Sequence, residues 1–522
     1  MSTQHALPEW LPAGADHPAH AKIVATLGPA SDSPEMIRRL IEAGVSVFRL
    51  NFSHGDLAEQ TRRIRNIREA MPESGRPVAI LGDLQGPKIR VGAVPDLDES
   101  GGIVVQTGEE IEFRAGVVEA FRDGSLPVFG TGFDRIFHDV EPGQRVLIND
   151  GAVRMLAVDR DPGRSLRCTV TFGGRVTTKK GINLPDSDLK FPAITDKDWE
   201  CVAWGVEHGV DYFALSFVRT ADEINVLKDR LSSMCSVDRA YADPEVGLQI
   251  PVIAKIEKPQ ALRNLDAIIE AADGIMVARG DLGVEMDAAH VPVAQKHIVS
   301  RCAKYGKPCI VATQMLESMI ESGSPTRAEA SDVANAIFDG ADAVMLSGET
   351  AVGAHPVLVV DTMRRIVQVA EARIDHQDHA PVPPEHLQEF PYRSAALAQG
   401  AWHIARAADA VLVITWSQRG GMARYLSQND FRIPILACTS SPIAARRMAL
   451  FGGVTPLRID PPAGGTLADW TDQMESFLLD TGMAKLGDAV VMIAGKPLGS
   501  VIAQDTLSIL RVGDADSGFR PR

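Results

Sequence analysis

A regular alternation of short apolar runs and helix-like segments is the feature that most constrains the fold of this chain. Runs rich in Val, Ile and Ala that end in Gly or charged residues are typical of strands buried on both faces. We predict eight such strands, at Lys22–Leu27, Val45–Ser53, Val78–Leu84, Tyr212–Val218, Pro251–Glu257, 274–281, Pro308–Thr313 and Ala343–Leu346. Helical spacing separates them, for example in Glu35–Ala43, Lys258–Ala272 and Arg327–Asp339. Eight β/α units close a (β/α)8 TIM barrel, whose functional residues lie at the carboxyl ends of the strands.

The alternation is interrupted once and gives way to a different pattern near the carboxyl end. Short β-type runs between Gly and Asp turns, such as Val146–Ile148, fill residues 88–188 and predict an inserted small β-barrel domain. Strands expected at Ala410–Thr415, Ile433–Ala437, Val490–Ile493 and Ser508–Val512 predict a further αβ domain. The expected division is a flexible extension at 1–20, the barrel at 21–87 and 189–375, the inserted domain at 88–188, a linker at 376–391 and the αβ domain at 392–522.

Composition limits the classes of protein and partner. The 522 residues are 45% hydrophobic and 23% charged, as in a soluble globular protein with a large core. A net charge of −15 argues against nucleic acid as a partner and requires local positive charge wherever an anionic substrate binds. Six cysteines without a CxxC pair predict reduced thiols. No apolar run approaches the ~18 residues of a membrane span, so we expect a cytoplasmic protein without a membrane partner.

Charged residues gather at the predicted carboxyl ends of the barrel strands. Residues two apart on a strand share a face, so Lys255 and Glu257 point the same way. Asp281 ends the neighbouring strand, and adjacent strands lie roughly 5 Å apart. Other strand ends add Arg49, Asp83, Lys88, Arg90, Thr313 and Glu349 to the same rim. Because bulky branched residues normally fill a barrel interior, so many polar groups predict a functional site.

The Glu257 and Asp281 carboxylates predict a divalent metal. Two carboxylates at this spacing repel each other unless a cation lies between them, and oxygen ligands completed by water suit Mg²⁺. A lysine beside the metal suits the transfer of a phosphoryl group, which carries negative charge. For Lys255 and Glu257 alone, a strand-end salt bridge is the simpler interpretation, because structural ion pairs are common. The number of polar groups at the rim favours the site.

Six motifs, in order along the chain, resemble the pyruvate kinase family. They are Phe48–Gly55, Gly86–Arg90, Ile253–Glu257, Met276–Gly283, Ala312–Met319 and Met345–Thr350. The resemblance runs from about residue 21 to the end, and it implies the same barrel, with a β lid inserted after strand three and a regulatory αβ domain. It also implies Mg²⁺-dependent phosphoryl transfer from phosphoenolpyruvate to ADP, giving pyruvate and ATP in the last step of glycolysis. A homotetramer is implied as well.

The resemblance implies a role for each matched residue. Glu257 and Asp281 would bind Mg²⁺, Lys255 would neutralise the transferred group, and Arg49 would hold the substrate phosphate. The N–H groups of Gly280 and Asp281, with the Thr313 hydroxyl, would bind the substrate carboxylate. The proton that enolpyruvate takes up could come from water relayed by Thr313, and this donor stays open. The nucleotide, arriving with a second Mg²⁺, would contact Asn51, His54, Arg90 and Lys180.

The third-strand motif departs from family members that need K⁺. Those members generally carry Thr-Lys-Gly-Pro-Glu after the strand-three Asp, whereas here Asp83 is followed by Leu84-Gln-Gly-Pro-Lys88. Leu84 removes a K⁺ ligand from the region of Asn51, Ser53 and Asp83. Lys88 replaces an acid with an ammonium, which can supply the positive charge of K⁺. We therefore expect catalysis without added K⁺.

A loop in the last domain resembles the effector loop of the family. Thr415, Ser417, Arg419 and Gly420 follow a predicted strand, and the backbone N–H groups of such a turn can cradle a phosphate. Family loops are usually richer in Ser and Thr, with Lys where Trp416 stands. Two interpretations stay open, a site for a phosphorylated effector and an ordinary αβ turn.

Two other functions share part of this pattern. Another Mg²⁺-dependent oxo-acid barrel enzyme, such as an aldolase or a lyase, would use the Glu/Asp pair but would have no use for the inserted β domain. A catalytically silent, metabolite-sensing homologue would be expected to have lost Lys255, Thr313 or a metal carboxylate, and all of these are present.

Overall fold

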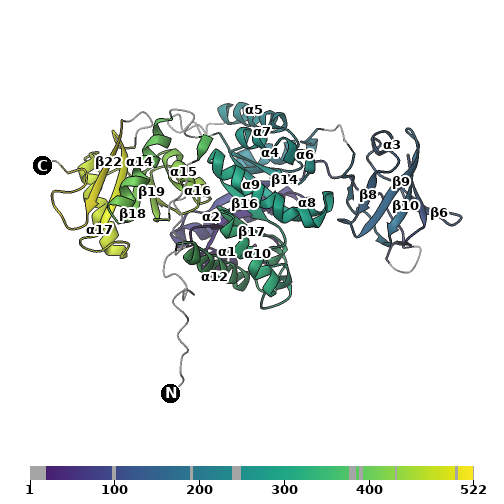
Figure 1. Cartoon of the computed structure of the whole chain (residues 1–522), viewed down its shortest axis with the longest axis horizontal. Coiled ribbons are helices and arrows are strands. Elements are labelled where there is room, and N and C mark those ends of the chain that lie inside the picture. The colour runs from purple at the N-terminus through teal and green to yellow at the C-terminus, as the bar shows by residue number, and fades with distance from the viewer. Residues whose placement is uncertain are drawn as a thin grey trace, which may run out of the picture.

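The computed structural model describes residues 19–96, 101–187, 192–237, 249–375, 384–386, 392–429, 432–499 and 504–520. Most of the predicted extension at 1–20 and of the predicted linker at 376–391 lies outside these residues. Along the longest axis, the inserted β sheet, the barrel and the carboxyl-terminal αβ part follow one another (Figure 1).

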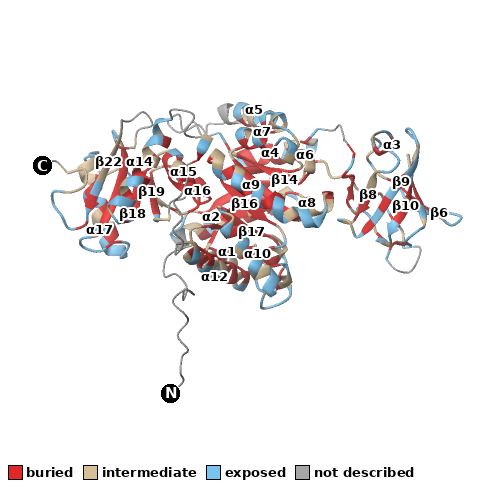
Figure 2. Cartoon of the chain, viewed as in Figure 1, coloured by how far each residue is buried: buried red, intermediate tan, exposed pale blue. Residues whose placement is uncertain are grey.

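Eight parallel strands form a closed barrel in the middle of the molecule, which confirms the predicted fold class. They are β1 (Lys22–Thr26), β2 (Val45–Asn51), β3 (Ala79–Asp83), β13 (Tyr212–Leu215), β14 (Val252–Ile256), β15 (Gly274–Ala278), β16 (Cys309–Ala312) and β17 (Ala343–Leu346). The ring closes because β1 pairs with both β2 and β17. The strands are buried on both faces (Figure 2), as their continuous apolar sequences predict.

Helices separate the barrel strands along the chain. They are α1 (Pro34–Ala43), α2 (Leu57–Ser74), α4 (Asp196–His208), α5 (Ala221–Val237), α6 (Pro259–Arg263), α7 (Leu265–Ala271), α8 (Arg279–Glu285), η1 (Ala288–His290), α9 (Val291–Tyr305), η2 (Glu317–Ile320), α10 (Arg327–Phe338), α11 (Gly348–Ala351) and α12 (Pro356–Asp375). Side-chain caps fix several starts; Thr326 and Glu329, for example, form a capping box at α10. Within the described residues, no helix is long and apolar enough to cross a membrane.

Three differences between the predicted and the observed elements lie in the barrel. The helix predicted over 258–272 is broken at Asn264 (φ −108°, ψ 18°), whose side-chain amide donates to the Arg219 carbonyl at 2.8 Å. The strand predicted to reach Val218 ends at Leu215, because Phe217 adopts a φ of +56°. Residues from Arg279 onward, predicted to end the sixth strand, form α8 instead. The last two differences lie where the barrel strands end.

The residues between β3 and α4 form a seven-stranded sheet, in the order β12-β8-β9-β10-β5-β7-β6, and a two-stranded sheet of β11 and β4. The bounds are β4 (Ile103–Val105), β5 (Glu110–Arg114), β6 (Phe121–Asp123), β7 (Leu126–Phe129), α3 (Ile136–Asp139), β8 (Arg145–Ile148), β9 (Val153–Asp161), β10 (Ser165–Phe172), β11 (Gly174–Val176) and β12 (Ile182–Asn183). One apolar core, which includes Phe113 and Phe129, holds them together.

The two connections between the inserted sheet and the barrel pair with each other. The Val91 N–H donates to the Lys180 carbonyl at 2.9 Å, and the Ile182 N–H donates to the Ile89 carbonyl at 2.9 Å. The inserted sheet therefore joins the barrel through a narrow two-stranded ribbon, at the end where the barrel strands terminate.

The carboxyl-terminal part is a five-stranded sheet, in the order β20-β19-β18-β21-β22, with apolar cores on both faces. The bounds are α14 (Arg393–Ala407), β18 (Ala410–Trp416), α15 (Gly421–Gln428), β19 (Ile435–Thr439), α16 (Pro442–Met448), β20 (Val454–Arg458), α17 (Leu467–Thr481), β21 (Ala489–Lys496) and β22 (Gln504–Arg511).

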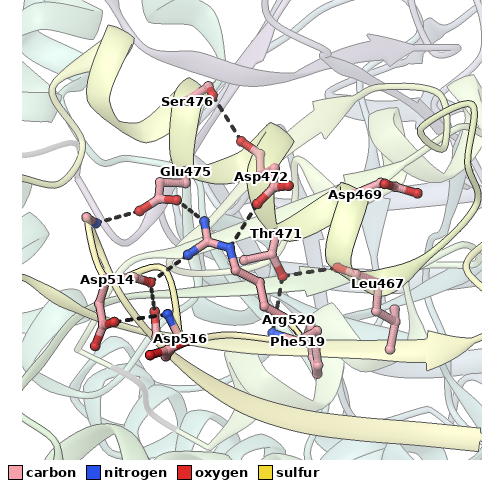
Figure 3. A network of polar contacts seen from close by, with 12 residues as sticks. Leu467, Asp469, Thr471, Asp472, Glu475, Ser476, Asp514, Asp516, Phe519 and Arg520 are labelled. Carbon is pink, nitrogen blue, oxygen red and sulfur yellow. Dashed lines mark hydrogen bonds and ion pairs between the residues drawn. The ribbon is translucent and has the colours of Figure 1, made fainter. Parts of the chain in front are cut away.

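Arg520 fastens the residues after β22 to α17 (Figure 3). Its Nε donates to Asp472 Oδ1 at 2.9 Å, its Nη1 donates to the Asp514 carbonyl at 2.6 Å, and its Nη2 pairs with Glu475. The guanidinium thereby bridges the helix and the turn that follows the last strand.

The amino-terminal end of the barrel contacts the αβ part. Asp211, directly before β13, is buried between Arg68 of α2 at 3.2 Å and Arg446 of α16 at 2.8 Å. Burial raises the pKa of Asp211, but the neighbouring arginines lower it further, so the carboxyl group stays ionised. The Tyr212 hydroxyl donates to the Arg447 carbonyl at 2.6 Å.

Candidate active site

Lys255, in β14, lies at the centre of the polar cluster that the sequence predicts. Its Nζ is 2.8 Å from Glu257 Oε1 and 3.1 Å from Asp83 Oδ1, and it donates to Ser216 Oγ at 2.8 Å. Burial lowers the pKa of Lys255, but the two carboxylates more than compensate, so the net pKa is raised and the ammonium stays charged. The simpler interpretation, a salt bridge between Lys255 and Glu257, is thus present, but Lys255 also contacts Asp83 and Ser216.

Arg49 and Asp83 extend this group across the barrel mouth. Arg49 Nε is 2.6 Å from Asp83 Oδ2, and Arg49 Nη1 donates to Thr26 Oγ1 at 3.1 Å. Burial raises the pKa of Asp83, but Lys255 and Arg49 lower it further, so the net pKa is depressed. Two cations are therefore held beside one ionised acid, and an anionic ligand could bind them.

Glu257 carries the features expected of a metal ligand. It is 1% exposed, and its Oε2 accepts the Phe217 N–H at 2.7 Å. Burial raises the pKa of Glu257 to about 7; Asp281 contributes to the rise and Lys255 opposes it. A divalent cation would relieve the buried charge and the repulsion from Asp281.

The donor set is small, as Mg²⁺ sites in enzymes often are. Among the described residues, no three His, Cys, Asp or Glu side chains gather in a group able to hold a metal. Glu257 and Asp281 would therefore supply two carboxylates and leave the other positions to water and substrate oxygens, an arrangement that Mg²⁺ accepts. The residues present fit that ion.

Thr313 follows β16 in an unusual backbone conformation. Thr313 and Gln314 have φ values of +68° and +54°, which non-glycine residues rarely adopt. Thr313 Oγ1 accepts the Gly280 N–H at 2.7 Å and donates to the Ala312 carbonyl at 2.6 Å. The Gly280 N–H, predicted to bind a substrate carboxylate, is thus donated to the Thr313 hydroxyl in this structure.

Arg279 braces this turn from behind. Its Nη2 donates to the Thr313 carbonyl at 2.8 Å and to the Gln314 carbonyl at 3.3 Å, while its Nη1 is 2.6 Å from Asp332 Oδ2 of α10. Arg279 is buried, so its contacts with the two carbonyls are shielded from water, whereas the side chain of Asp332 is 40% exposed.

The predicted nucleotide-binding residues lie on two elements. Asn51 ends β2 and His54 lies in the turn after it, where Asn51 Oδ1 accepts the Ser53 N–H at 3.0 Å. Arg90 and Lys180 are in the ribbon that leads to the inserted sheet. Burial and then the charges of Arg49, Arg90 and Lys88 lower the pKa of His54, so these cations lie within electrostatic reach of its ring.

Lys88 and Glu349 belong to the predicted rim, but the ion pair of Lys88 and the hydrogen bonds of Glu349 are with residues outside the polar cluster around Lys255. Lys88 Nζ is 3.9 Å from Asp150 of the inserted sheet, whereas the ion pairs of Asp83 are with Arg49 and Lys255. The Glu349 carboxylate accepts the backbone N–H groups of Ser347 at 2.6 Å and Leu316 at 3.2 Å. Glu349 therefore shapes the loops after β16 and β17.

Sequence reasoning missed Ser216 and Phe217. Ser216 Oγ accepts from Lys255 and donates to the Leu84 carbonyl at 2.6 Å, and the Phe217 N–H holds Glu257. Both follow β13, so the rule that places strand-end residues in the pocket could have found them. Nothing in the sequence indicated the positive φ of Phe217.

Strand β18 runs to Trp416, so Thr415 lies in the strand and the predicted loop begins at Ser417. Ser417 Oγ accepts a backbone N–H at the start of α15 at 3.2 Å, and Thr415 is fully buried. Trp416 is also buried, and its ring packs edge-on against Trp470 at 6.1 Å between centroids. The hydroxyls at 415 and 417 thus face the interior, and effector binding here stays a prediction.

Comparisons with known proteins agree with this geometry. A family model described as the pyruvate kinase barrel domain matches residues 19–360, and one described as the pyruvate kinase alpha/beta domain matches residues 395–510. A pyruvate kinase of Mycobacterium intracellulare is 40% identical over 95% of this chain and 99% of its own length. One of Geobacillus stearothermophilus is 39% identical over 94% of this chain and 80% of its own length.

The fold matches as well. The crystal structure of a pyruvate kinase from Cryptosporidium parvum is 31% identical and superimposes with a TM-score of 0.83. The match covers 96% of this chain and 98% of that chain.

Proposed function

The chain belongs to the pyruvate kinase family of phosphotransferases, and we propose that it transfers the phosphoryl group of phosphoenolpyruvate to ADP, giving pyruvate and ATP. The observation that carries this proposal is the Lys255 ammonium, which is buried and shared between Asp83 and Glu257. A fixed cation beside a metal-binding carboxylate suits a reaction in which charge spreads over a moving phosphoryl group.

The roles of the site residues follow from their positions. Glu257 and Asp281 would hold a Mg²⁺ ion that supplies positive charge to the substrate oxygens, and a second Mg²⁺ would enter with ADP. Lys255 would neutralise the transferring group and Arg49 the substrate phosphate, each released in part from Asp83 when the anion binds. Thr313 and the N–H groups of Gly280 and Asp281 would orient the substrate carboxylate.

The remaining parts take supporting roles in this proposal. The cations Arg90 and Lys180, on the ribbon, would bring the inserted sheet over the nucleotide held by Asn51 and His54, so residues 88–188 would act as a lid. The barrel, at 21–87 and 189–375, would carry the chemistry, and residues 392–522 would form a regulatory domain. We further propose that the enzyme is a cytoplasmic homotetramer, as expected for the family, and that it needs no K⁺.

Lys255→Met provides the decisive test, because it keeps the bulk of the side chain and removes its charge. Losing one such stabilising cation should lower kcat by roughly 10²- to 10³-fold, about 3–4 kcal/mol of transition-state stabilisation. The measurement is pyruvate formation in a coupled assay with phosphoenolpyruvate, ADP and Mg²⁺. Lys22→Met is the matched control: Lys22 is an equally buried lysine on β1, near the opposite end of the barrel, and kcat should change less than twofold.

Omission of ADP separates the alternatives. Pyruvate that forms only with ADP identifies a kinase, whereas pyruvate formed from an oxo-acid substrate without ADP identifies an aldolase or lyase. Metal and phosphoenolpyruvate binding without turnover identifies a silent sensor. An undiminished kcat in Lys255→Met contradicts the proposed mechanism.

A further inference from the structure

An ion pair joins the two elements that carry the proposed metal carboxylates. Lys258 directly follows Glu257 after β14, and Glu285 lies one helical turn after Asp281 on α8. Lys258 Nζ is 3.1 Å from Glu285 Oε1, with both side chains buried. Because Glu257 and Asp281 repel each other, a link between the segments that bear them limits how far the two carboxylates can separate.

The same carboxylate holds the returning strand of the inserted sheet. Asn183, the last residue of β12, donates through Nδ2 to Glu285 Oε1 at 2.9 Å. Asn183 is 9% exposed and follows directly on Ile182, which pairs with Ile89 in the ribbon. A displacement of the inserted sheet would therefore pull on Glu285.

The connection that leads from the barrel to the inserted sheet packs against Phe217, at the other end of this group. The Phe217 ring centroid lies 5.7 Å from Lys258 Nζ, and the Phe217 N–H holds Glu257. A Cβ atom added at Gly86, where the chain leaves the barrel, would lie 2.8 Å from Phe217 Cδ2. Both connections to the inserted sheet thus contact residues that hold or neighbour Glu257 and Asp281.

The group is only partly satisfied in this arrangement. Glu285 Oε2 and Asn183 Oδ1 are buried and have no hydrogen-bond partner within the described part of the chain. An ammonium has three N–H donors, and Lys258 already contacts the other oxygen of the Glu285 carboxylate. An unpaired buried acceptor is costly. A second arrangement, in which Lys258 or the ribbon donates to these two oxygens, would remove that cost.

We propose that Lys258, Glu285 and Asn183 form a tie that sets the spacing of the Glu257 and Asp281 carboxylates and couples it to the position of the inserted sheet. The three are positioning residues, and the inference rests on the proposed metal site. Coupling of this kind is reciprocal: the position of the sheet changes the affinity for the divalent cation, and the bound cation changes the position of the sheet.

The first test is direct Mn²⁺ binding to the full chain, measured by electron paramagnetic resonance without substrate. Glu285→Gln keeps an acceptor for Asn183 but removes the charge that pairs with Lys258, and the Mn²⁺ Kd should rise about tenfold, within the usual range of coupling. Glu112→Gln is the matched control. Glu112 is a buried acid whose ion pairs, with Arg114 and Arg167, lie inside the inserted sheet, so Kd should stay within twofold of wild type.

The second test separates the two halves of the tie. Asn183→Ala leaves the Lys258–Glu285 ion pair intact, so Mn²⁺ should bind within about threefold of wild type. Hydrogen exchange at the Val91 and Ile182 amides, which hold the ribbon together, should slow on adding Mn²⁺ to wild type but not to Asn183→Ala.

The outcomes are distinct. A Kd for Glu285→Gln within twofold of wild type overturns the tie, as does an equal rise in Glu112→Gln, which would reflect general loosening of the sheet. If Glu285→Gln fails to fold, Lys258→Met takes its place with the same expected rise. Glu257→Gln tests the metal site itself: unchanged Mn²⁺ binding there overturns the proposed site, and the tie with it, whereas lost binding with an unaffected Glu285→Gln overturns the tie alone.

Discussion

Arg279 shows how a single side chain can hold a reactive residue in place. It donates to the carbonyls of Thr313 and Gln314, two residues with positive φ, and is itself held by Asp332. Such conformations cost about 1–3 kcal/mol each and persist only when their surroundings fix them. The donor geometry of Arg279 supplies that support.

Arg279→Met should therefore release the Thr313 turn. We expect kcat to fall about 10- to 100-fold, as misplacement of a substrate-positioning group does, with a higher KM for phosphoenolpyruvate and an unchanged KM for ADP. Steady-state kinetics with each substrate varied in turn gives the answer. Arg301→Met, which removes an exposed ion pair with Asp266 on α7, is the control and should leave all three constants unchanged. Equal rises in both KM values would point to general unfolding of the barrel mouth.

Lys88 leads to a prediction about monovalent cations. Under the proposal that its ammonium replaces K⁺, wild-type activity in Na⁺ buffer should not rise more than about twofold when KCl replaces NaCl at constant ionic strength. Lys88→Glu should lose activity in Na⁺ and regain part of it in K⁺. Many-fold activation of the wild type by KCl would show that the salt bridge to Asp150, rather than replacement of K⁺, is the main role of Lys88.

Site residues could be predicted from the sequence where they lie on a regular strand, and could not where the backbone turns irregularly. Lys255 and Glu257 were placed together from strand periodicity alone, and the structure has them 2.8 Å apart. Ser216 was missed although it follows a barrel strand, and the chain beyond it turns away through the positive φ of Phe217, which no propensity signals. Glu349 lies at the predicted rim, but its carboxylate is used by backbone N–H groups, and sequence does not reveal such a local partner.

Among the elements, the ribbon to the inserted sheet is constrained at Gly86. Its φ is +68°, and a Cβ atom would lie 2.8 Å from the Phe217 ring and 3.2 Å from Ser216 Cβ. Gly86→Ala should strain this turn by about 1–3 kcal/mol and displace Phe217, whose N–H holds Glu257.

We expect Gly86→Ala to raise the Mg²⁺ concentration needed for half-maximal activity, which a titration of the coupled assay with MgCl₂ measures. Gly124→Ala, in the turn between β6 and β7, is the control: it also has a positive φ (+65°), but its Cβ meets no atom within 4 Å. If both variants respond alike to Mg²⁺, backbone strain in the inserted sheet explains the effect and contact with Phe217 does not.

Elements with long, uniform patterns were predictable, and those at the ends of strands were not. The eight barrel strands follow from buried apolar runs, and the parallel order follows from the intervening helices. Helix α8 was read as the end of a strand, because its first five residues include two glycines and an aspartate, which have low helix propensity. Tertiary contacts of Arg279 and Glu285 hold it in helical form.

For the whole molecule, Lys22 on β1 makes a pH-dependent contribution to stability. Burial, with help from Arg76 and against Glu371, lowers the pKa of Lys22 from 10.5 to about 8. Above pH 10.5 the amine is neutral whether the chain is folded or unfolded. As the pH falls from 10.5 to 8 only the unfolded chain gains the proton, so the folded state loses about 3 kcal/mol, which it regains as the pH rises.

Lys22→Met removes this penalty at the cost of one hydrogen bond to the Val454 carbonyl. Its thermal midpoint should exceed that of wild type at pH 7.5, and the difference should shrink as the pH approaches 10. Differential scanning calorimetry of both proteins across this range measures it. Lys296→Met, which removes an exposed lysine, is the control. A difference for Lys22→Met that does not change with pH would mean that the Lys22 ammonium keeps its ordinary pKa.

The order of the large parts was readable from the sequence, whereas their contacts were not. The break in the β/α alternation located the inserted sheet, but nothing in the pattern indicated that its two connecting strands pair, or that Asn183 reaches Glu285. Such contacts join residues about a hundred positions apart, and only the closed barrel brings them together.

Strand β13 has only four residues, yet Asp211 before it meets the αβ part and Ser216 after it meets Lys255. The barrel is thus a poor module for recombination: grafted onto a foreign carboxyl-terminal half, it would retain an ionised Asp211 without Arg446. Exchanging the carboxyl-terminal half alone should therefore lower the stability of the barrel, because Asp211 would lose one of its two ion pairs.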